Sequence, residues 1–232
     1  MKFNLNDYKN IWFTSDLHLG HNKDFLYSPR GCSSRDEHVN MIIDGINSQA
    51  GPADLIFHCG DMCLSSTFKE FMSWVMEIKC NNVYSIIGNH ESNFSKLITN
   101  QQLRHVPSEL WGYMESDKQY CGMGPQQEIT IIEPSGIMGQ KAYRYPITLN
   151  HYPMQLWNKS HHGSWHLCGH LHGSFAETAI DYPHYKRFDC GVENGLKYKE
   201  IGEGFMFHWE DVKVIMSEKS IFNGDHHNKD TT

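Results

Sequence analysis

Five short clusters of Asp, Asn and His residues each follow a run of apolar residues in this sequence. The clusters are Asp16-Leu17-His18, Gly60-Asp61, Gly88-Asn89-His90-Glu91, Asn150-His151 and Gly169-His170-Leu171-His172. Carboxylate and amide oxygens, together with imidazole nitrogens, are ligands for divalent ions such as manganese, iron, zinc, nickel and cobalt. A site that holds two such ions also requires an anion that bridges them. The clusters therefore predict metal-dependent chemistry.

The apolar runs are the elements that must position these clusters. Runs at residues 11–15, 55–57, 83–87 and 147–149 are typical of buried strands. Helical patterns from Asp36 to Gln49 and from Thr67 to Lys79 separate the first three runs and predict a βαβαβ opening. Parallel strands bring their carboxyl ends to one edge of a sheet, so we expect the clusters to converge there. Alternation in an extended chain also predicts that Asp16 and His18, like His170 and His172, face one cavity.

The pattern changes after residue 129. Shorter strand candidates at residues 129–133, 143–149, 165–168 and 187–190 indicate a second, more antiparallel sheet, and an amphipathic helix is expected from Trp209 to Ser217. Residues 114–124 and 134–140 are expected to form loops or a small hairpin over the site. With 232 residues and 39% hydrophobic composition, the chain is predicted to form one domain over residues 1–222 and a flexible tail over residues 223–232.

Composition limits the classes of function. A formal charge of −7 argues against broad binding of nucleic acids. The sequence has no apolar segment long enough for a membrane span and no secretion signal at its start, so we expect a cytoplasmic protein without membrane association. Seven scattered cysteines without a C-x-x-C pair favour reduced thiols, and Cys59 and Cys63 beside Asp61 are expected to pack in the core. The oligomeric state is left open.

Taken in order, the five clusters resemble the calcineurin-like metallophosphoesterase superfamily, whose D-x-H, G-D, G-N-H-[D/E], H and G-H-x-H blocks are complete between Ile11 and His172. The resemblance implies an α/β fold, a four-layer α/β/β/α sandwich of two mixed β-sheets with a dinuclear metal site at the carboxyl-terminal edge of the strands. It implies two divalent ions per chain, with manganese as the first expectation and iron, zinc, nickel or cobalt as alternatives. One ion would be held by Asp16, His18, Asp61 and His172, and the other by Asp61, Asn89, His151 and His170.

The resemblance also implies a reaction. A hydroxide that bridges the two metals would attack phosphorus in line, and His90 would protonate the leaving oxygen. Asn89 would ligate through an amide oxygen without adding negative charge. We therefore expect a metal-dependent phosphoester hydrolase, with a phosphodiesterase for small or nucleotide-like substrates, including cyclic nucleotides, as the leading hypothesis. The alternatives are a phosphomonoesterase, a nuclease for single-stranded nucleic acid, and an inactive metal-binding scaffold.

Two departures from better-known relatives narrow this expectation. Phosphoprotein phosphatases carry G-D-x-x-D-R-G and G-N-H-E-x-R blocks, and their arginines, which hold the substrate phosphate, are missing here. The carboxylate that would orient the catalytic His is replaced by Leu64, so the sequence does not show what positions His90. The surroundings of His151 and His170 instead resemble small metallophosphoesterases of bacteria and phages.

Residues outside the blocks supply weaker candidates. His21 and Asn22 follow the first cluster closely and are candidates for substrate contact, with a simple turn as the alternative. His162, in a loop with His161, is a second candidate, with an exposed polar loop as the alternative. The aromatic residues Trp111, Tyr113, Tyr152 and Trp157 are candidates for stacking on a nucleobase, although aromatic residues are ordinarily part of the core. His38 and His58 are expected to be structural.

Overall fold

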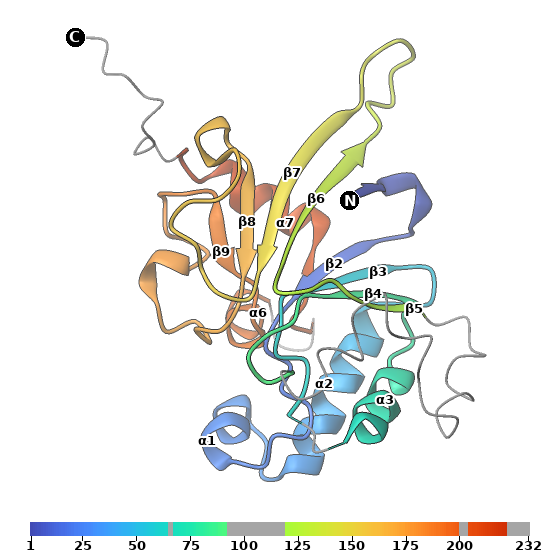
Figure 1. The fold of residues 1–232 in the computed structure, drawn as a ribbon, viewed down its shortest axis with the longest axis vertical. Helices are drawn as coiled ribbons and strands as arrows, with labels where there is room; N and C mark the ends of the chain where they lie inside the picture. Colours follow the sequence, from blue (N-terminus) through green and yellow to red (C-terminus); the bar gives the residue numbers. More distant parts are fainter. Residues whose placement is uncertain (65–66, 92–118, 200–203, 222–232) are drawn as a thin grey trace.

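The computed structural model describes residues 1–64, 67–91, 119–199 and 204–221, and in this part of the chain two five-stranded sheets form a sandwich (Figure 1). One sheet has the order β10 (Phe207–His208), β2 (Ile11–Thr14), β3 (Leu55–His58), β4 (Asn82–Ser85) and β5 (Gln119–Gly122). The other has the order β1 (Lys2–Asn4), β6 (Gln126–Glu133), β7 (Tyr143–Asn150), β8 (Trp165–Cys168) and β9 (Arg187–Asp189). Each contains parallel and antiparallel neighbours, which confirms the predicted α/β fold with two mixed sheets.

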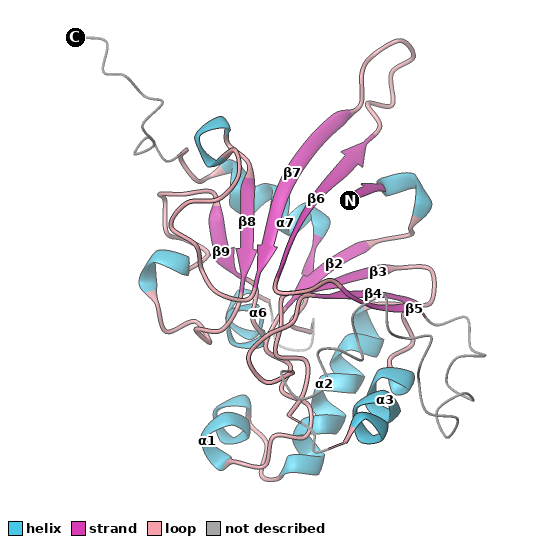
Figure 2. Cartoon of the chain, viewed as in Figure 1, coloured by secondary structure: helices cyan, strands magenta, loops and turns pink. Residues whose placement is uncertain are grey.

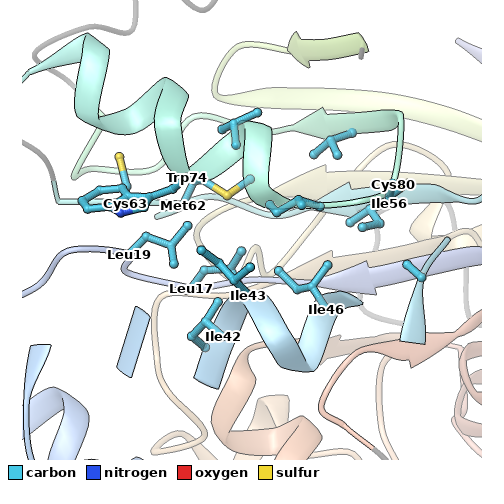
Figure 3. Packing of buried hydrophobic residues seen from close by; sticks show 14 of the residues in the cluster. Leu17, Leu19, Ile42, Ile43, Ile46, Ile56, Met62, Cys63, Trp74 and Cys80 are labelled. Atoms are coloured by element: carbon cyan, nitrogen blue, oxygen red, sulfur yellow. The ribbon is translucent and has the colours of Figure 1, made fainter. Parts of the chain in front are cut away.

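Two helices form the outer layer on the sheet that contains β2 (Figure 2). Helix α2 (Arg35–Gln49) begins where the side chain of Ser34 accepts the N–H of Glu37, and α3 (Phe68–Glu77) begins where Thr67 accepts the N–H of Glu70. Both confirm the predicted helices. Their apolar faces pack on the sheet in one core cluster; Figure 3 shows Ile42, Ile43 and Ile46 of α2 with Ile56 of β3.

A second core lies between the sheets, and the apolar face of α7 (Trp209–Ser217) belongs to it. The ring of Trp209 is 6.3 Å from that of Phe13 on one sheet, and 5.0 and 5.5 Å from those of Tyr145 and Trp165 on the other. This helix has the bounds that the sequence predicted. Trp209 therefore contacts strands of both sheets.

The outer face of the second sheet is covered by residues 152–164, which include the 3-10 helix η5 (Ser160–His162). The Trp157 ring lies 5.3 Å from the ring of His166 on β8, and the Asn158 amide donates to Glu128 of β6 at 2.9 Å. The remaining short elements are α1 (Asp24–Tyr27), α6 (Val192–Tyr198), and the 3-10 helices η1 (Leu5–Asp7), η2 (Ser28–Arg30) and η6 (Ala176–Thr178).

The second sheet is less antiparallel than expected. Among its described pairings, β6 and β7 are antiparallel, whereas β7 with β8 and β8 with β9 are parallel. Parallel neighbours need long crossover connections, and residues 151–164 and 169–186 supply them. As a result, β7 and β8 both end at the edge where β2 and β3 end (Figure 1).

Two loop predictions need correction. Within residues 114–124, Gln119–Gly122 forms β5, parallel to β4, and residues 114–118 lie outside the described part of the chain. Residues 134–140 join β6 to β7 at the end of the hairpin far from the end of β7 that carries His151, so they do not cover the site (Figure 1). The predicted tail, residues 223–232, also lies outside the described residues.

The described cysteine side chains are buried, as expected for core packing: Cys32, Cys59, Cys63, Cys80, Cys168 and Cys190. Within the described part of the chain, no helix has the length and apolar character that a membrane span requires.

Trp209→Ala should lower the free energy of unfolding by about 3–5 kcal/mol, because it removes a fully buried ring that contacts both sheets. Urea denaturation of the full chain measures this change. Val214→Ala on the same helix is the control, since Val214 is 54% exposed and should change stability little. Equal effects of the two substitutions would contradict the role given to Trp209.

Candidate metal centre

The predicted ligands come together where strands of the two sheets end (Figure 1). Asp16 follows β2 and Asp61 follows β3, whereas His151 and His170 follow β7 and β8. A parallel bridge between Ser15 and Gly191 links the two halves beside the site. The carboxyl ends of strands from both sheets thus surround one polar region.

The backbone at this region is unusual, because five of the predicted ligands have positive φ angles: Asp16 (58°), His18 (50°), Asp61 (59°), His170 (72°) and His172 (49°). Residues with side chains rarely adopt this left-handed conformation, which costs about 1–2 kcal/mol each. Such strain clusters at functional sites, where the surrounding contacts maintain it. The expected strand alternation is therefore wrong: Asp16 and His18 converge through a left-handed turn beyond β2, and His170 and His172 do the same beyond β8.

The first group of side chains contains Asp16, His18 and His172, whose ligand atoms all lie within 4.8 Å of one another. His18 Nε2 lies 3.7 Å from Asp16 Oδ1 and 3.1 Å from His172 Nε2. His18 Nε2 is also 3.8 Å from Asp61 Oδ2. The four residues that the family pattern assigned to one metal are neighbours in space.

The second group contains Asp61, His151 and His170, again within 4.8 Å. His151 Nε2 lies 3.3 Å from Asp61 Oδ2 and 3.0 Å from Asn89 Oδ1. Asp61 belongs to this group, and with His18 and His90 it forms a further cluster whose ligand atoms lie within 4.8 Å of one another. Asp61 therefore lies between His18 of the first group and His151 of the second, where a bridging carboxylate is expected.

The lone pairs of the predicted ligand atoms face one another, as expected of a site for a cation. His151 Nδ1 lies 3.0 Å from the carbonyl oxygen of Cys59, to which it donates, so in the neutral ring Nε2 has a free lone pair. That lone pair faces the oxygens of Asp61 and Asn89, which are also acceptors. A proton or a metal ion is needed between them. Burial raises the pKa of Asp61, but the hydrogen bond and charge of His151 lower it further, so its pKa is below the ordinary value and it remains ionised.

His90 lies beside the two groups on their more open side. Its side chain is 31% exposed, and its Nε2 lies 3.6 Å from Asp61 Oδ2. The backbone N–H of His90 donates to Asp61 Oδ1 at 3.0 Å. The structure thus supplies an anchor that the sequence did not show: Asp61 fixes the backbone of His90, while Leu64 is 37% exposed and offers no carboxylate.

Of the weaker candidates, His21 lies at the site. Its ring is 5.8 Å from that of His18 and 6.3 Å from that of His90, and it is 6% exposed. Burial and the neighbouring His18 lower the pKa of His21 to about 4, so it is neutral at neutral pH. Asn22 is exposed on the adjoining turn.

Two other candidates are placed away from the metal groups. Trp157 is 6% exposed, and its indole N–H donates to the carbonyl of Ser164 at 3.1 Å, so it has no free face for stacking. His162 lies on η5 before β8, whereas His170 follows the other end of that strand. The substrate roles suggested for both residues stay predictions, and no contact in the described structure supports them. His38 and His58 are buried, as expected of structural residues.

Among the proposed stacking residues, Tyr152 does lie at the site. It is 49% exposed, its ring is 4.6 Å from that of His170, and its hydroxyl donates to Asn89 Oδ1 at 3.4 Å. Trp111 and Tyr113 fall outside the described residues.

Sequence reasoning missed two buried carboxylates that hold the ligand turns. Glu91 accepts the backbone N–H groups of Asp61, Cys63 and Gly88 at 2.7 to 3.2 Å. Asp189 accepts those of Gly173 and Gly191 at 3.0 and 2.8 Å. Burial raises the pKa of each to about 7, with further contributions from Asp61 and Asp16 respectively. The available signal was Glu91 itself, an acidic residue inside the third cluster.

Two glycines of the clusters lie where a side chain would collide with a predicted ligand. A Cβ atom at Gly88 would lie 2.1 Å from Asp61 Oδ1, and one at Gly169 would lie 2.3 Å from Asp16 Oδ2. The two carboxylates thus approach the backbone of neighbouring turns too closely for any side chain there.

Gly88→Ala should displace Asp61 and lower the metal content of the protein, with a loss of stability of about 1–3 kcal/mol from overpacking. Elemental analysis after equilibration with manganese, together with thermal denaturation, measures both effects. Gly51→Ala is the matched control, because a Cβ there meets nothing within 4 Å. Metal binding by Gly88→Ala at the wild-type level would show that the position of Asp61 does not matter.

Comparisons with known proteins agree with this geometry. The family model for the calcineurin-like phosphoesterases matches residues 9–192. None of the curated proteins matches the chain at a significant level. The structure is similar to the crystal structure of AQ665, a protein of unknown function from Aquifex aeolicus, with a TM-score of 0.53, 15% identity, and coverage of 89% of this chain and 98% of that chain. At this identity the likeness shows the fold alone. The family match extends over most of the chain, and the chain therefore belongs to the calcineurin-like phosphoesterases, a family of metal-dependent phosphoester hydrolases.

Proposed function

We propose that this protein is a phosphodiesterase for small, nucleotide-like substrates, including cyclic nucleotides, and that it uses two divalent ions. The observation that supports this proposal is the position of Asp61, which belongs to the second ligand group and lies 3.8 Å from His18 of the first, with His90 beside it. Asp16, His18, Asp61 and His172 would hold one ion, and Asp61, Asn89, His151 and His170 the other. Two divalent ions supply Lewis-acid stabilisation of the phosphoryl oxygens and a nucleophile at neutral pH. Manganese is the first choice for assays.

His90 is the proposed proton donor to the leaving oxygen. It is partly exposed, whereas the neighbouring ligands His18 and His151 are buried, so a substrate can reach its imidazole. Its backbone is fixed to Asp61, which keeps the ring beside both groups. A general acid must lie within hydrogen-bonding reach of the atom that it protonates. The 3.6 Å between His90 Nε2 and Asp61 Oδ2 supports this role for a phosphoryl group that the two ions would hold.

The charge around the groups favours a diester over a monoester. A monoester dianion carries one more negative charge than a diester, and relatives that cleave phosphoproteins neutralise it with arginines. Here, within the described part of the chain, the arginine that touches the ligand turns is Arg30, whose guanidinium is fully buried. Tyr152 and Asn89, which are exposed beside the site, carry no charge.

With manganese present, the protein should hydrolyse bis(p-nitrophenyl) phosphate with a kcat/KM at least about tenfold higher than p-nitrophenyl phosphate, a difference of about 1.4 kcal/mol in transition-state stabilisation. Absorbance assays on the metal-loaded protein measure both, and Asp61→Asn is the inactive control. A reversed ratio identifies a phosphomonoesterase. Preferred cleavage of a labelled single-stranded oligonucleotide identifies a nuclease, and no hydrolysis by protein that holds two ions identifies a scaffold.

His90→Asn should reduce kcat by about 10²–10⁴ on a diester with an alkoxide leaving group, the usual contribution of a general acid. The loss should be smaller for p-nitrophenyl esters, because p-nitrophenolate leaves without protonation. Metal content should stay at the wild-type level. Equal losses on both esters, or loss of an ion, would show that His90 acts in another way.

A further inference from the structure

Arg30, whose side chain is fully buried, and Glu193, whose side chain is 18% exposed, form an ion pair that contacts two of the strained ligand turns. Arg30 Nη2 donates to the carbonyl oxygen of Asp16 at 2.8 Å, and Nη1 donates to that of Leu17 at 3.1 Å. Glu193 Oε1 accepts from Arg30 Nε at 2.9 Å and Nη2 at 2.7 Å, and lies 3.0 Å from His172 Nδ1. The pair thus joins the turn after β2 to the turn after β8.

The guanidinium has no capacity left for a ligand. Its remaining N–H donates to His38 Nε2 at 2.9 Å, so all five donors of Arg30 are used. Burial and the charge of Arg30 lower the pKa of His38 to about 4, which keeps this ring neutral and able to accept. Arg30 is therefore a fixed part of the structure.

The contact between Glu193 and His172 determines which ring nitrogen carries the proton. A carboxylate accepts, so His172 Nδ1 is protonated and Nε2 is left with its lone pair. That Nε2 lies 3.1 Å from His18 Nε2 and 3.8 Å from Asp16 Oδ1, in the first ligand group. Histidines that bind metals ordinarily donate their other N–H in this way, which orients the ring and raises its basicity.

We infer that Glu193, held by Arg30, is the positioning residue of one metal site: it fixes the tautomer and orientation of His172, and Arg30 holds the turn that carries Asp16 and His18. This inference rests on the proposed two-metal function but assigns a role to residues outside the five clusters. Glu193 also lies beyond the residues 9–192 that the family model matches.

In the second ligand group, a backbone carbonyl and not a carboxylate accepts the ring N–H of His151. His151 Nδ1 donates to the backbone carbonyl of Cys59 and does not contact Glu193 or Arg30 in the described structure. Loss of Glu193 should therefore weaken one ion selectively, and this asymmetry distinguishes positioning from a general loss of stability.

The test is calorimetric titration of metal-free protein with manganese. Glu193→Ala should weaken one of two binding steps by about 10–100-fold and leave the other within about threefold of wild type. Glu193→Gln, which keeps an oxygen acceptor for Arg30, should preserve folding and show a smaller loss at the same step. The matched control is Glu177→Ala, because Glu177 also pairs with a buried arginine, Arg187, at 2.9 Å but does not contact a predicted ligand.

A second readout does not depend on metal binding. In ¹⁵N NMR spectra of the metal-free protein, His172 should show a protonated Nδ1 in the wild type and a mixture of tautomers in Glu193→Ala. The inference is overturned if both binding steps weaken equally, if neither changes, or if the tautomer is the same in both proteins. A wild-type protein that binds two ions without hydrolysing any phosphoester would refute the proposed function and leave the role of Glu193 intact.

Discussion

The carboxylates of Asp16 and Asp61 each accept a backbone N–H from the turn of another cluster, and the rest of the site depends on these bonds. His170 donates its N–H to Asp16 Oδ2 at 2.9 Å, and His90 donates to Asp61 Oδ1 at 3.0 Å. Since Asp16 and His170 belong to different sheets, the first bond also holds the sandwich together at its polar end. Each carboxylate can accept a backbone N–H and also bind a metal ion, because it has two oxygens with several lone pairs.

These bonds require close approach, and close approach explains the local sequence. Gly88 and Gly169 have no Cβ because a carboxylate occupies that space. The left-handed turns at Asp16, Asp61 and His170 direct both the side chain and the backbone groups inward. Buried backbone groups need partners, and Glu91 and Asp189 accept the N–H groups while Arg30 donates to the carbonyls. The strain is thus maintained by charged groups that lie behind the ligands.

The interactions between the carboxylates and the histidines at this site are strong because the groups are buried. Asp16 and Asp61 are almost completely shielded from water, and the low local dielectric strengthens their interactions with the histidines. The same burial, together with the charge of a neighbouring carboxylate, raises the pKa of Glu91 and of Asp189 to about 7. Divalent ions would lower the cost of placing these acidic groups so close together. The ionisation of the predicted ligands Asp16 and Asp61 is therefore coupled to that of Glu91 and Asp189, the carboxylates that hold the ligand turns.

The sequence by itself determined most of the elements and which Asp, Asn and His residues lie close together. Periodicity located α2, α3 and α7, and the apolar runs located seven of the ten described strands, β2 to β4 and β6 to β9, because both patterns are local. The short edge strands β1, β5 and β10 were not predicted. The order of the Asp, Asn and His clusters indicated which side chains would meet, and the structure brings them together.

Only the tertiary structure decided how they meet. Strand alternation did not predict the left-handed turn at His18, because positive φ angles there depend on partners distant in the chain. The sequence suggested Trp157 and His162 as substrate contacts, but the crossover before β8 places them away from the ligands. Glu193 gave no signal at all, since its importance comes from a hydrogen bond to His172 and an ion pair with Arg30, which is remote in sequence. Local patterns specify elements and chemistry, whereas the supports of a site are set by long-range contacts that only the fold creates.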